Sequence, residues 1–146
     1  MIREFEKLES LNHRINMLVD EYERLRARVI STGSLSSAEG TGVQSDVADV
    51  KRRQDTRLAK LSDLSIYIDH LVDEYVDKRL ELLDWVTANE AGFTVLESAI
   101  IIAKYLEFKR FEEIARSLRV SRSTVYNTFA SARAKLLPIT YVAKGA

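Results

Sequence analysis

The feature that most constrains the fold is a seam of apolar residues along the first thirty positions. Apolar side chains recur there at intervals of three and four, and charged residues fill most other positions. The seam consists of Phe5, Leu8, Leu11, Ile15, Leu18, Tyr22, Leu25 and Val29. Such intervals place one stripe along an α-helix, and a heptad stripe is typical of a coiled coil. We therefore predict one coiled-coil helix over residues 1–30.

A second, wider apolar stripe predicts a longer helix over residues 47–90. A helix of some 40 residues is about 60 Å long, so it must pack on the first helix, on another chain, or on both. Residues 31–46 are rich in Ser and Gly and have no apolar period, so we expect a flexible linker. The repeated pentapeptide LVDEY, at 18–22 and 71–75, fits either a duplicated arm or a chance match.

Residues 91–138 have the pattern of a compact helical domain, and residues 139–146 read as a tail. Asn89 and Gly92 end the long helix, and Thr94 begins the next one. Thr94 and Glu97 have the spacing of a capping box, in which each side chain accepts from the other residue's backbone N–H. The helix that follows is apolar nearly all round, which predicts that it forms the core of the domain.

Residues 111–137 carry the pattern of a helix-turn-helix. Phe111, Ile114, Ala115 and Leu118 share one helical face. Ser121 is placed to cap a second helix, whose apolar face is formed by Val125, Phe129, Ala132 and Leu136. In such motifs the second helix lies in the major groove of DNA, and its N-terminal residues reach the base edges.

The segment SLRVSRSTVYNTFASARAKL resembles the DNA-reading part of region 4 of bacterial sigma factors. Together with the preceding LESAIIIAKYLEFKRFEEIA, it is more similar to small phage-encoded transcriptional regulators of the ArpU and RinA type. The resemblance covers residues 94–137. The chain departs from the family pattern in three places: Arg119 replaces the usual turn glycine, Arg110 a Ser or Thr cap, and Arg133 an apolar residue. Arg119 leaves the turn geometry least defined, because few non-glycine residues adopt a positive φ.

The polar face of the second helix supplies the candidate DNA contacts. We expect base contacts from Arg122, Ser123, Tyr126 and Asn127, with Arg122 pairing with guanine and Asn127 with adenine. We expect phosphate contacts from Arg116, Arg119, Ser121, Arg133 and Lys135. The alternative for all of these residues is an ordinary solvated helix face.

The distribution of charge favours the same part of the chain. The net charge is zero, but residues 1–93 carry 13 basic and 18 acidic residues, whereas residues 94–146 carry 9 basic and 4 acidic ones. We therefore expect the C-terminal part to meet a polyanion. With no Cys and only His13 and His70, the sequence offers no catalytic set, and we expect no enzyme, cofactor, metal site or small-molecule substrate. No apolar run is long enough for a membrane span and no secretory signal is visible, so we expect the host cytoplasm.

The predicted fold is thus all-α, with long helical hairpin or coiled-coil arms followed by a compact helix-turn-helix domain. The predicted function is sequence-specific DNA binding that regulates phage or prophage genes, and the resemblance implies an activator working beside host RNA polymerase. Alternatives are a DNA-packaging recognition subunit, like a small terminase subunit, and a protein-interaction module that does not bind DNA. We also expect a homo-oligomer held by the arms, although the seam can close within one chain or between chains. The self-association residues are Leu8, Leu11, Ile15, Leu18, Tyr22, Leu25, Leu61, Ile68, Val72 and Tyr75.

Overall fold

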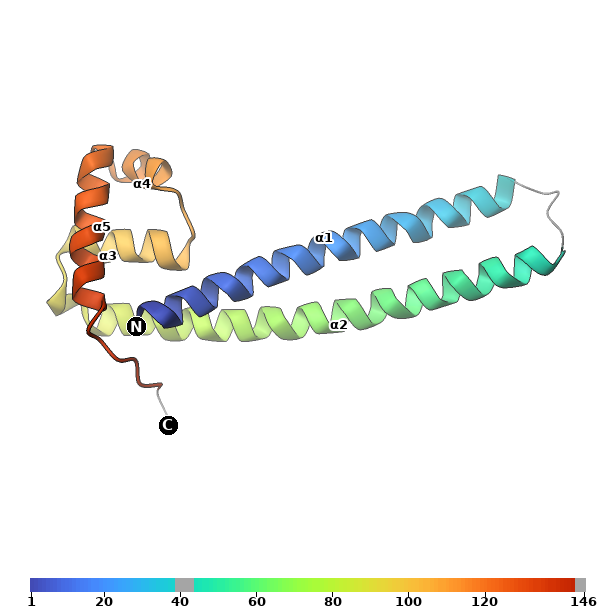
Figure 1. Ribbon diagram of the computed structural model, residues 1–146, viewed down its shortest axis with the longest axis horizontal. Helices are drawn as coiled ribbons and strands as arrows, with labels where there is room; N and C mark the ends of the chain where they lie inside the picture. Colours follow the sequence, from blue (N-terminus) through green and yellow to red (C-terminus); the bar gives the residue numbers. More distant parts are fainter. Residues whose placement is uncertain (39–43, 144–146) are drawn as a thin grey trace. The chain divides into compact units, whose positions relative to one another are not determined.

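The computed structural model describes residues 1–38 and 44–143, and every regular element in these ranges is helical. Two long helices come first, α1 (Ile2–Ala38) and α2 (Gln44–Ala88) (Figure 1). Shorter elements follow: the 3-10 turn η1 (Glu90–Gly92), α3 (Val95–Ile101), the π-helical segment η2 (Ile102–Leu106), α4 (Phe111–Leu118) and α5 (Arg122–Leu136). The predicted all-α class, with long helical arms followed by smaller helices, is confirmed.

The chain divides into two compact units. One, which we call the head, comprises Met1–Asn12 and Glu74–Ala146. The other, the arm, comprises His13–Asp73. Each long helix therefore contributes to both units, and the two units are described separately below.

In the arm, the parts of α1 and α2 lie side by side and run in opposite directions (Figure 1). Ile15 of the seam and Leu71 of α2 are buried between them, and the hydroxyl of Tyr67 on α2 accepts a hydrogen bond from Arg14 on α1. Five of the residues predicted for self-association are half-buried in the arm, namely Leu18, Tyr22, Leu25, Leu61 and Ile68. Val72 is exposed. The seam of the arm therefore closes within one chain.

The predicted linker over residues 31–46 is largely wrong. Helix α1 continues to Ala38 and α2 begins at Gln44, so only residues 39–43 of that stretch lie outside the described residues. Once a helix is nucleated, each added residue gains a backbone hydrogen bond at little cost. A single glycine, Gly33, subtracts only about 1 kcal/mol from that gain. Ser-rich composition alone was thus too weak a signal to end the helix.

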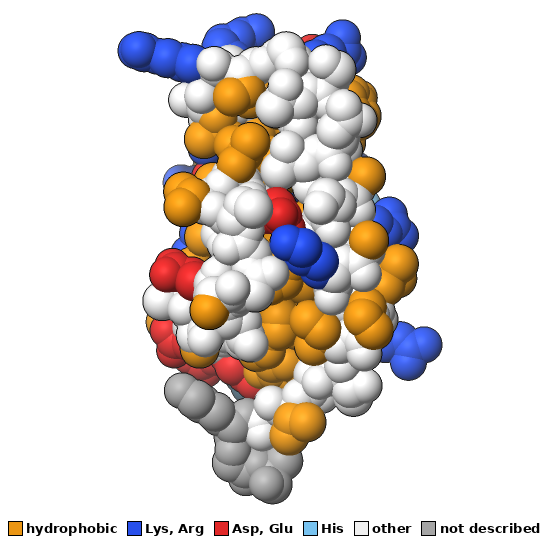
Figure 2. All heavy atoms as spheres, turned by 90° about the vertical axis from the view of Figure 1, so that its left-hand side faces the viewer, with side chains coloured by type: hydrophobic (Ala, Val, Ile, Leu, Met, Phe, Trp, Pro, Cys, Tyr) orange, Lys and Arg blue, Asp and Glu red, His pale blue; other side chains and the backbone are white. Residues whose placement is uncertain are grey.

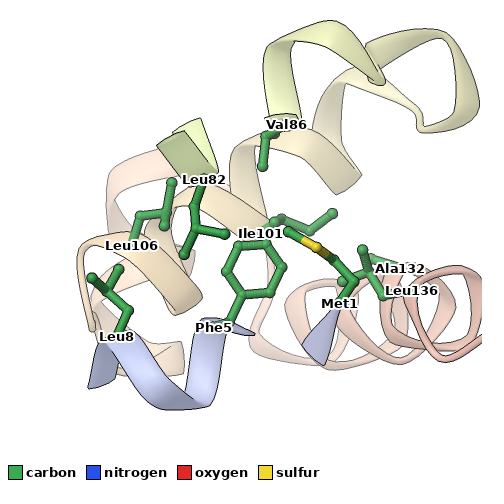
Figure 3. Packing of buried hydrophobic residues seen from close by; sticks show 9 residues of the cluster. All are labelled: Met1, Phe5, Leu8, Leu82, Val86, Ile101, Leu106, Ala132 and Leu136. Carbon is green, nitrogen blue, oxygen red and sulfur yellow. The ribbon is translucent and has the colours of Figure 1, made fainter. Parts of the chain in front are cut away.

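The head is built around a core to which both ends of the chain contribute (Figure 3). The ring of Phe5, from the first turns of α1, is fully buried among side chains of α2, α3 and η2, and stacks on Tyr105 at a centroid distance of 4.7 Å. The buried residues of this core are Met1, Phe5, Leu8, Leu82, Val86, Ile101, Leu106, Ala132 and Leu136. The first residues of the seam thus serve the head and not only a coiled coil. Of the other predicted self-association residues, Leu11 and Tyr75 are half-buried in the head.

Ion pairs and hydrogen bonds join the elements of the head at its surface. Lys78 of α2 donates to Glu4 of α1 at 2.8 Å, and hydrogen bonding to Lys78 lowers the pKa of Glu4 although burial opposes the shift. The predicted tail is partly a packed segment. Ile139 and Tyr141 pack against the core, and the hydroxyl of Tyr141 donates to Glu81. Burial and this carboxylate raise the pKa of Tyr141.

Candidate nucleic-acid interface

Helix α4 occupies the predicted range Phe111–Leu118 and ends in a backbone cap. Arg119 adopts the left-handed conformation (φ 56°, ψ 43°), and the N–H groups of Arg119 and Val120 both donate to the carbonyl of Ala115. The left-handed residue thus ends the helix with two donors on the carbonyl of Ala115. At the other end, Arg110 supplies no side-chain cap, as its departure from the family pattern suggested.

Replacing Arg119 with glycine should stabilise the protein and, if Arg119 contacts phosphate as the sequence predicts, should weaken binding to DNA. The left-handed conformation costs a residue with a Cβ about 1–2 kcal/mol, and glycine avoids this cost. Because glycine also gains freedom in the unfolded chain, we expect a net stabilisation of about 0.5–1 kcal/mol. Arg119→Ala is the matched control, since it removes the same charge but retains a Cβ. Urea unfolding should separate the two variants in stability, whereas both should lose the same small factor in affinity for all DNA sequences.

Helix α5 begins as predicted at a serine cap. The hydroxyl oxygen of Ser121 accepts a hydrogen bond from the N–H of Thr124 at 3.1 Å. Val125, Ala132 and Leu136 are fully buried, and Phe129 is half-buried beside α4. Burial of this apolar face fixes which side of α5 points away from the head.

All four predicted base-contacting residues, Arg122, Ser123, Tyr126 and Asn127, lie on the exposed side of α5. At 100° per residue they span about 140° of the helix circumference, starting at its first residue. The predicted phosphate partners Arg116, Arg119, Ser121 and Arg133 are exposed as well, and Arg133 lies on the same side as Arg122, three turns further on. Figure 2 shows basic side chains projecting from the upper end of its view, the end at which α5 begins in Figure 1.

Arg122 is paired with an acidic neighbour. Its guanidinium donates to Glu112 of α4 at 2.6 Å, and both side chains are about 60% exposed. Exposed ion pairs contribute only about 0–1 kcal/mol, so a better acceptor can displace Glu112 at little cost.

A basic, aromatic hollow of about 230 Å³ adjoins this pair. Phe111 forms one wall, with its ring 4.5 Å from that of Tyr126 and 4.6 Å from the ammonium of Lys104. The residues that line the hollow are Lys104, Arg110, Phe111, Glu112, Arg122 and Tyr126. The hollow lies at the N-terminal end of α4, where the first backbone N–H groups and the positive end of the helix dipole attract anions. Three cations and a helix start together favour a phosphate group.

The structure shows a partner for Lys135 that the sequence analysis did not predict. Lys135 lies about 140° around α5 from Arg122, and its ammonium donates to the carboxylate of Glu97 on α3 at 2.9 Å. Glu97 is 4% exposed, and its second oxygen has no hydrogen-bond partner among the described residues. Lys135 therefore compensates a buried charge and joins α3 to α5. The predicted capping box is half confirmed: the Thr94 hydroxyl accepts from the Glu97 N–H at 3.1 Å, but the Glu97 side chain turns to Lys135.

The Glu97–Lys135 pair makes stability depend on pH. Burial raises the pKa of Glu97, but the hydrogen bond and charge of Lys135, together with smaller contributions from the hydrogen bonds of Thr94, outweigh burial, and the pKa is lowered overall. A carboxyl with a lowered folded pKa contributes stability above its unfolded pKa, about 4.3, and loses it as the pH falls through the folded value. The free energy of unfolding, measured by urea titration from pH 7 to pH 3, should therefore fall at the acid end. In Lys135→Met, only the smaller contribution of the Thr94 hydrogen bonds opposes burial, so the folded pKa of Glu97 should rise and the loss of stability at the acid end should shrink or turn into a gain. An unchanged profile would contradict the pairing.

Sequence reasoning missed three contributors to this surface: Lys104, Arg110 as part of the hollow, and Glu112 as the partner of Arg122. Lys104 and Arg110 precede the motif, and their basic character was the only signal available. Glu112 lies ten residues before Arg122, a separation that no helix period joins. The described residues contain no group of His, Cys, Asp or Glu able to hold a metal ion, and no described helix is long and apolar enough to cross a membrane.

Comparisons of the chain with protein-family models, with curated proteins and with solved structures found no match.

Proposed function

We propose that the chain binds double-stranded DNA in a sequence-specific manner through the exposed side of α5. The observation that carries this proposal is the orientation of that helix. Its apolar face is buried in the head, and Arg122, Ser123, Tyr126 and Asn127 project from its capped N-terminal end. An α-helix presented in this way fits the major groove, where base edges carry a distinct donor and acceptor pattern.

The side chains suit different parts of the DNA surface. Arg122 can donate two hydrogen bonds to guanine, and Asn127 can donate to and accept from adenine. Ser123 and Tyr126 carry hydroxyls for bases or phosphates. When Arg122 turns to a base, the freed carboxylate of Glu112 can accept from the amino group of a neighbouring cytosine, or else repel the backbone.

Phosphate contacts would come from both ends of the helix pair. Arg116, Arg119 and Arg133 are exposed. The hollow at the start of α4 adds Lys104 and Arg110 to this set. These groups would fix the register of the protein on the duplex without reading the sequence.

The resemblance to sigma region 4 and to phage-encoded regulators suggests the biological context. In this proposal, DNA binding controls transcription of phage or prophage genes, with host RNA polymerase as the protein partner. Activation then depends on DNA binding, so loss of the α5 contacts would abolish both.

Titration of DNA binding against salt tests the proposal. A protein that displaces counterions from several phosphates must bind more weakly as salt rises, with a linear relation between the logarithms of affinity and salt concentration. We expect such a line in mobility-shift assays, and removal of Arg116 should reduce its slope by about one. Absence of any shift at low salt would favour the protein-interaction module. Binding to packaging-site DNA alone by a ring-shaped assembly would favour the packaging subunit.

A further inference from the structure

The arm leaves much of its apolar surface in contact with water. Among the side chains of the arm that the structure describes, only Ile15 and Leu71 are buried. In a hairpin each helix has a single helical neighbour, whereas long helices owe most of their stability to packing of their apolar faces. The uncovered apolar side chains therefore point to a further helical neighbour.

The hairpin of the arm has two broad sides, which differ in character. Arg14 of α1 and Tyr67 of α2 are in contact on one side. Val19 and Val72 each lie five residues after one member of this pair. Five residues rotate about 140° around a helix, and because α1 and α2 are antiparallel, both rotations lead past the helix interface to the other side. There Val19 is 39% and Val72 is 37% exposed, and we call this the open side of the arm.

The two sides are lined by different kinds of residue. Arg14 belongs to a groove on its own side, and six of the nine residues that line this groove are charged. On the open side, α2 instead carries a stripe with intervals of four and three, in which Leu58 is 49% exposed and Leu61 and Ile68 are half-buried. Such intervals keep one continuous stripe on a supercoiled helix, here about 38 Å long. The stripe consists of Val47, Lys51, Gln54, Leu58, Leu61, Ser65, Ile68 and Val72.

The intervals of this stripe are the same when they are read from either end. Two copies of α2, laid antiparallel about a point between residues 59 and 60, therefore bring opposite each other the stripe residues whose numbers add up to 119. Leu58 then meets the partner's Leu61 at the centre, and Val72 meets the partner's Val47 at each end. The stripe is thus complementary to a second copy of itself.

The distribution of charge along the arm favours the same antiparallel orientation. Its outer part, residues 24–60, contains eight basic and four acidic residues, a net charge of +4. Its inner part, residues 13–23 and 61–73, contains one basic and six acidic residues, a net charge of −5. An antiparallel partner lays each positive part beside a negative one and brings Lys51 close to the partner's Asp69. A parallel partner would set like charges against each other, which is destabilising.

We propose that a second copy of the chain packs on the open side of the arm in antiparallel orientation, so that the two hairpins form a four-helix bundle. A two-fold axis perpendicular to the arm places each long helix on its own copy, and the same side of both chains then makes the contact. The contact is two helices wide and about 38 Å long, so it buries roughly 750 Å² per copy, the size of a stable interface. This inference is independent of DNA binding by α5, since the arm carries none of the proposed DNA contacts.

The double variant Leu58→Glu with Val72→Glu, made in the full-length chain, tests the interface. Both side chains are exposed in the single chain, so the hairpin should still fold. Sedimentation equilibrium should show a wild-type dimer, and the variant should raise its dissociation constant by about 100-fold or more, because carboxylates would be buried without partners. Met17→Glu is the matched control: Met17 is 59% exposed but lines the groove on the other side, so this variant should remain a dimer.

Cysteine cross-linking tests the orientation, and it does not depend on the folding of a charged variant. The chain has no cysteine. Gln54→Cys and Ser65→Cys provide a pair of positions that add up to 119. A short bismaleimide should cross-link an equimolar mixture of the two variants into a covalent dimer, whereas neither variant alone should cross-link, because the two copies of one position lie several turns apart.

Other results overturn the proposal. A wild type that remains a monomer at low salt would exclude it, and cross-linking of Gln54→Cys with itself would show parallel pairing. A Met17→Glu monomer together with a double variant that dimerises as tightly as the wild type would place the contact on the groove side. Loss of DNA binding by a double variant that keeps the wild-type dimer would assign the open side to nucleic acid.

Discussion

Arg122→Ala should lower affinity for a preferred DNA sequence by about 5- to 150-fold, and should change affinity for unrelated DNA much less. A bidentate contact between arginine and guanine contributes about 1–3 kcal/mol of discrimination. Arg122 is exposed at the first residue of α5, and its side chain is paired with the equally exposed Glu112. Its loss should therefore not affect folding. Mobility-shift titrations with the preferred duplex and with unrelated duplexes, at the same salt concentration, measure the ratio of the two affinities for the wild type and for the variant.

Two further variants show whether Arg122 contacts a base or a phosphate. Arg116→Ala removes an exposed charge on α4 and should weaken binding to all sequences about equally. Glu112→Gln leaves Arg122 in place but removes the competing carboxylate, so it should raise affinity for unrelated DNA. If Arg122→Ala and Arg116→Ala gave the same pattern of losses, Arg122 would be a phosphate contact and the assignment of base reading would be wrong.

Phe5→Ala should destabilise the head by about 3–5 kcal/mol, the usual cost of removing a buried phenylalanine from a core. The ring is fully buried, stacks on Tyr105, and belongs to the same core as Ala132 and Leu136 of α5. Its loss should therefore loosen the support of the proposed reading helix. The protein has a single tryptophan, Trp85, which packs against this core, so fluorescence during urea unfolding reports directly on the head.

Leu80→Ala provides the control for Phe5→Ala. Leu80 lies on α2 within the head, but it is 51% exposed and outside the core. Its truncation should change the free energy of unfolding by no more than about 0.5 kcal/mol. Equal effects of the two variants would show that the start of α1 does not close the core.

Local signals in the sequence predicted the helix-turn-helix closely. The intervals of the apolar residues placed α4, and the serine cap placed the start of α5, because each signal acts within a few residues of the backbone that it orders. Arg119 was recognised as the uncertain point of the turn, and it does take a positive φ. The exposure of Arg122 and Asn127 followed from the burial of Val125 and its partners.

Features that depend on distant residues could not be predicted in this way. The ion pair of Lys135 could not be predicted, because its partner Glu97 lies 38 residues earlier on another helix. Phe5 looked like the start of a coiled-coil seam, although its partners come from η2 and α2. Helix α1 continues past Ile30, and α2 begins before Val47, because cooperative backbone hydrogen bonding outweighs a Ser-rich composition.

Selection of bound duplexes from a random pool tests the central claim most directly. If the exposed side of α5 reads DNA, several rounds with the wild-type chain should enrich one short motif, and the same selection with Arg122→Ala should lose preference at a defined position within it. If the wild-type pool remained random while the protein stayed folded, α5 would not be a reading helix and the proposed function would be wrong.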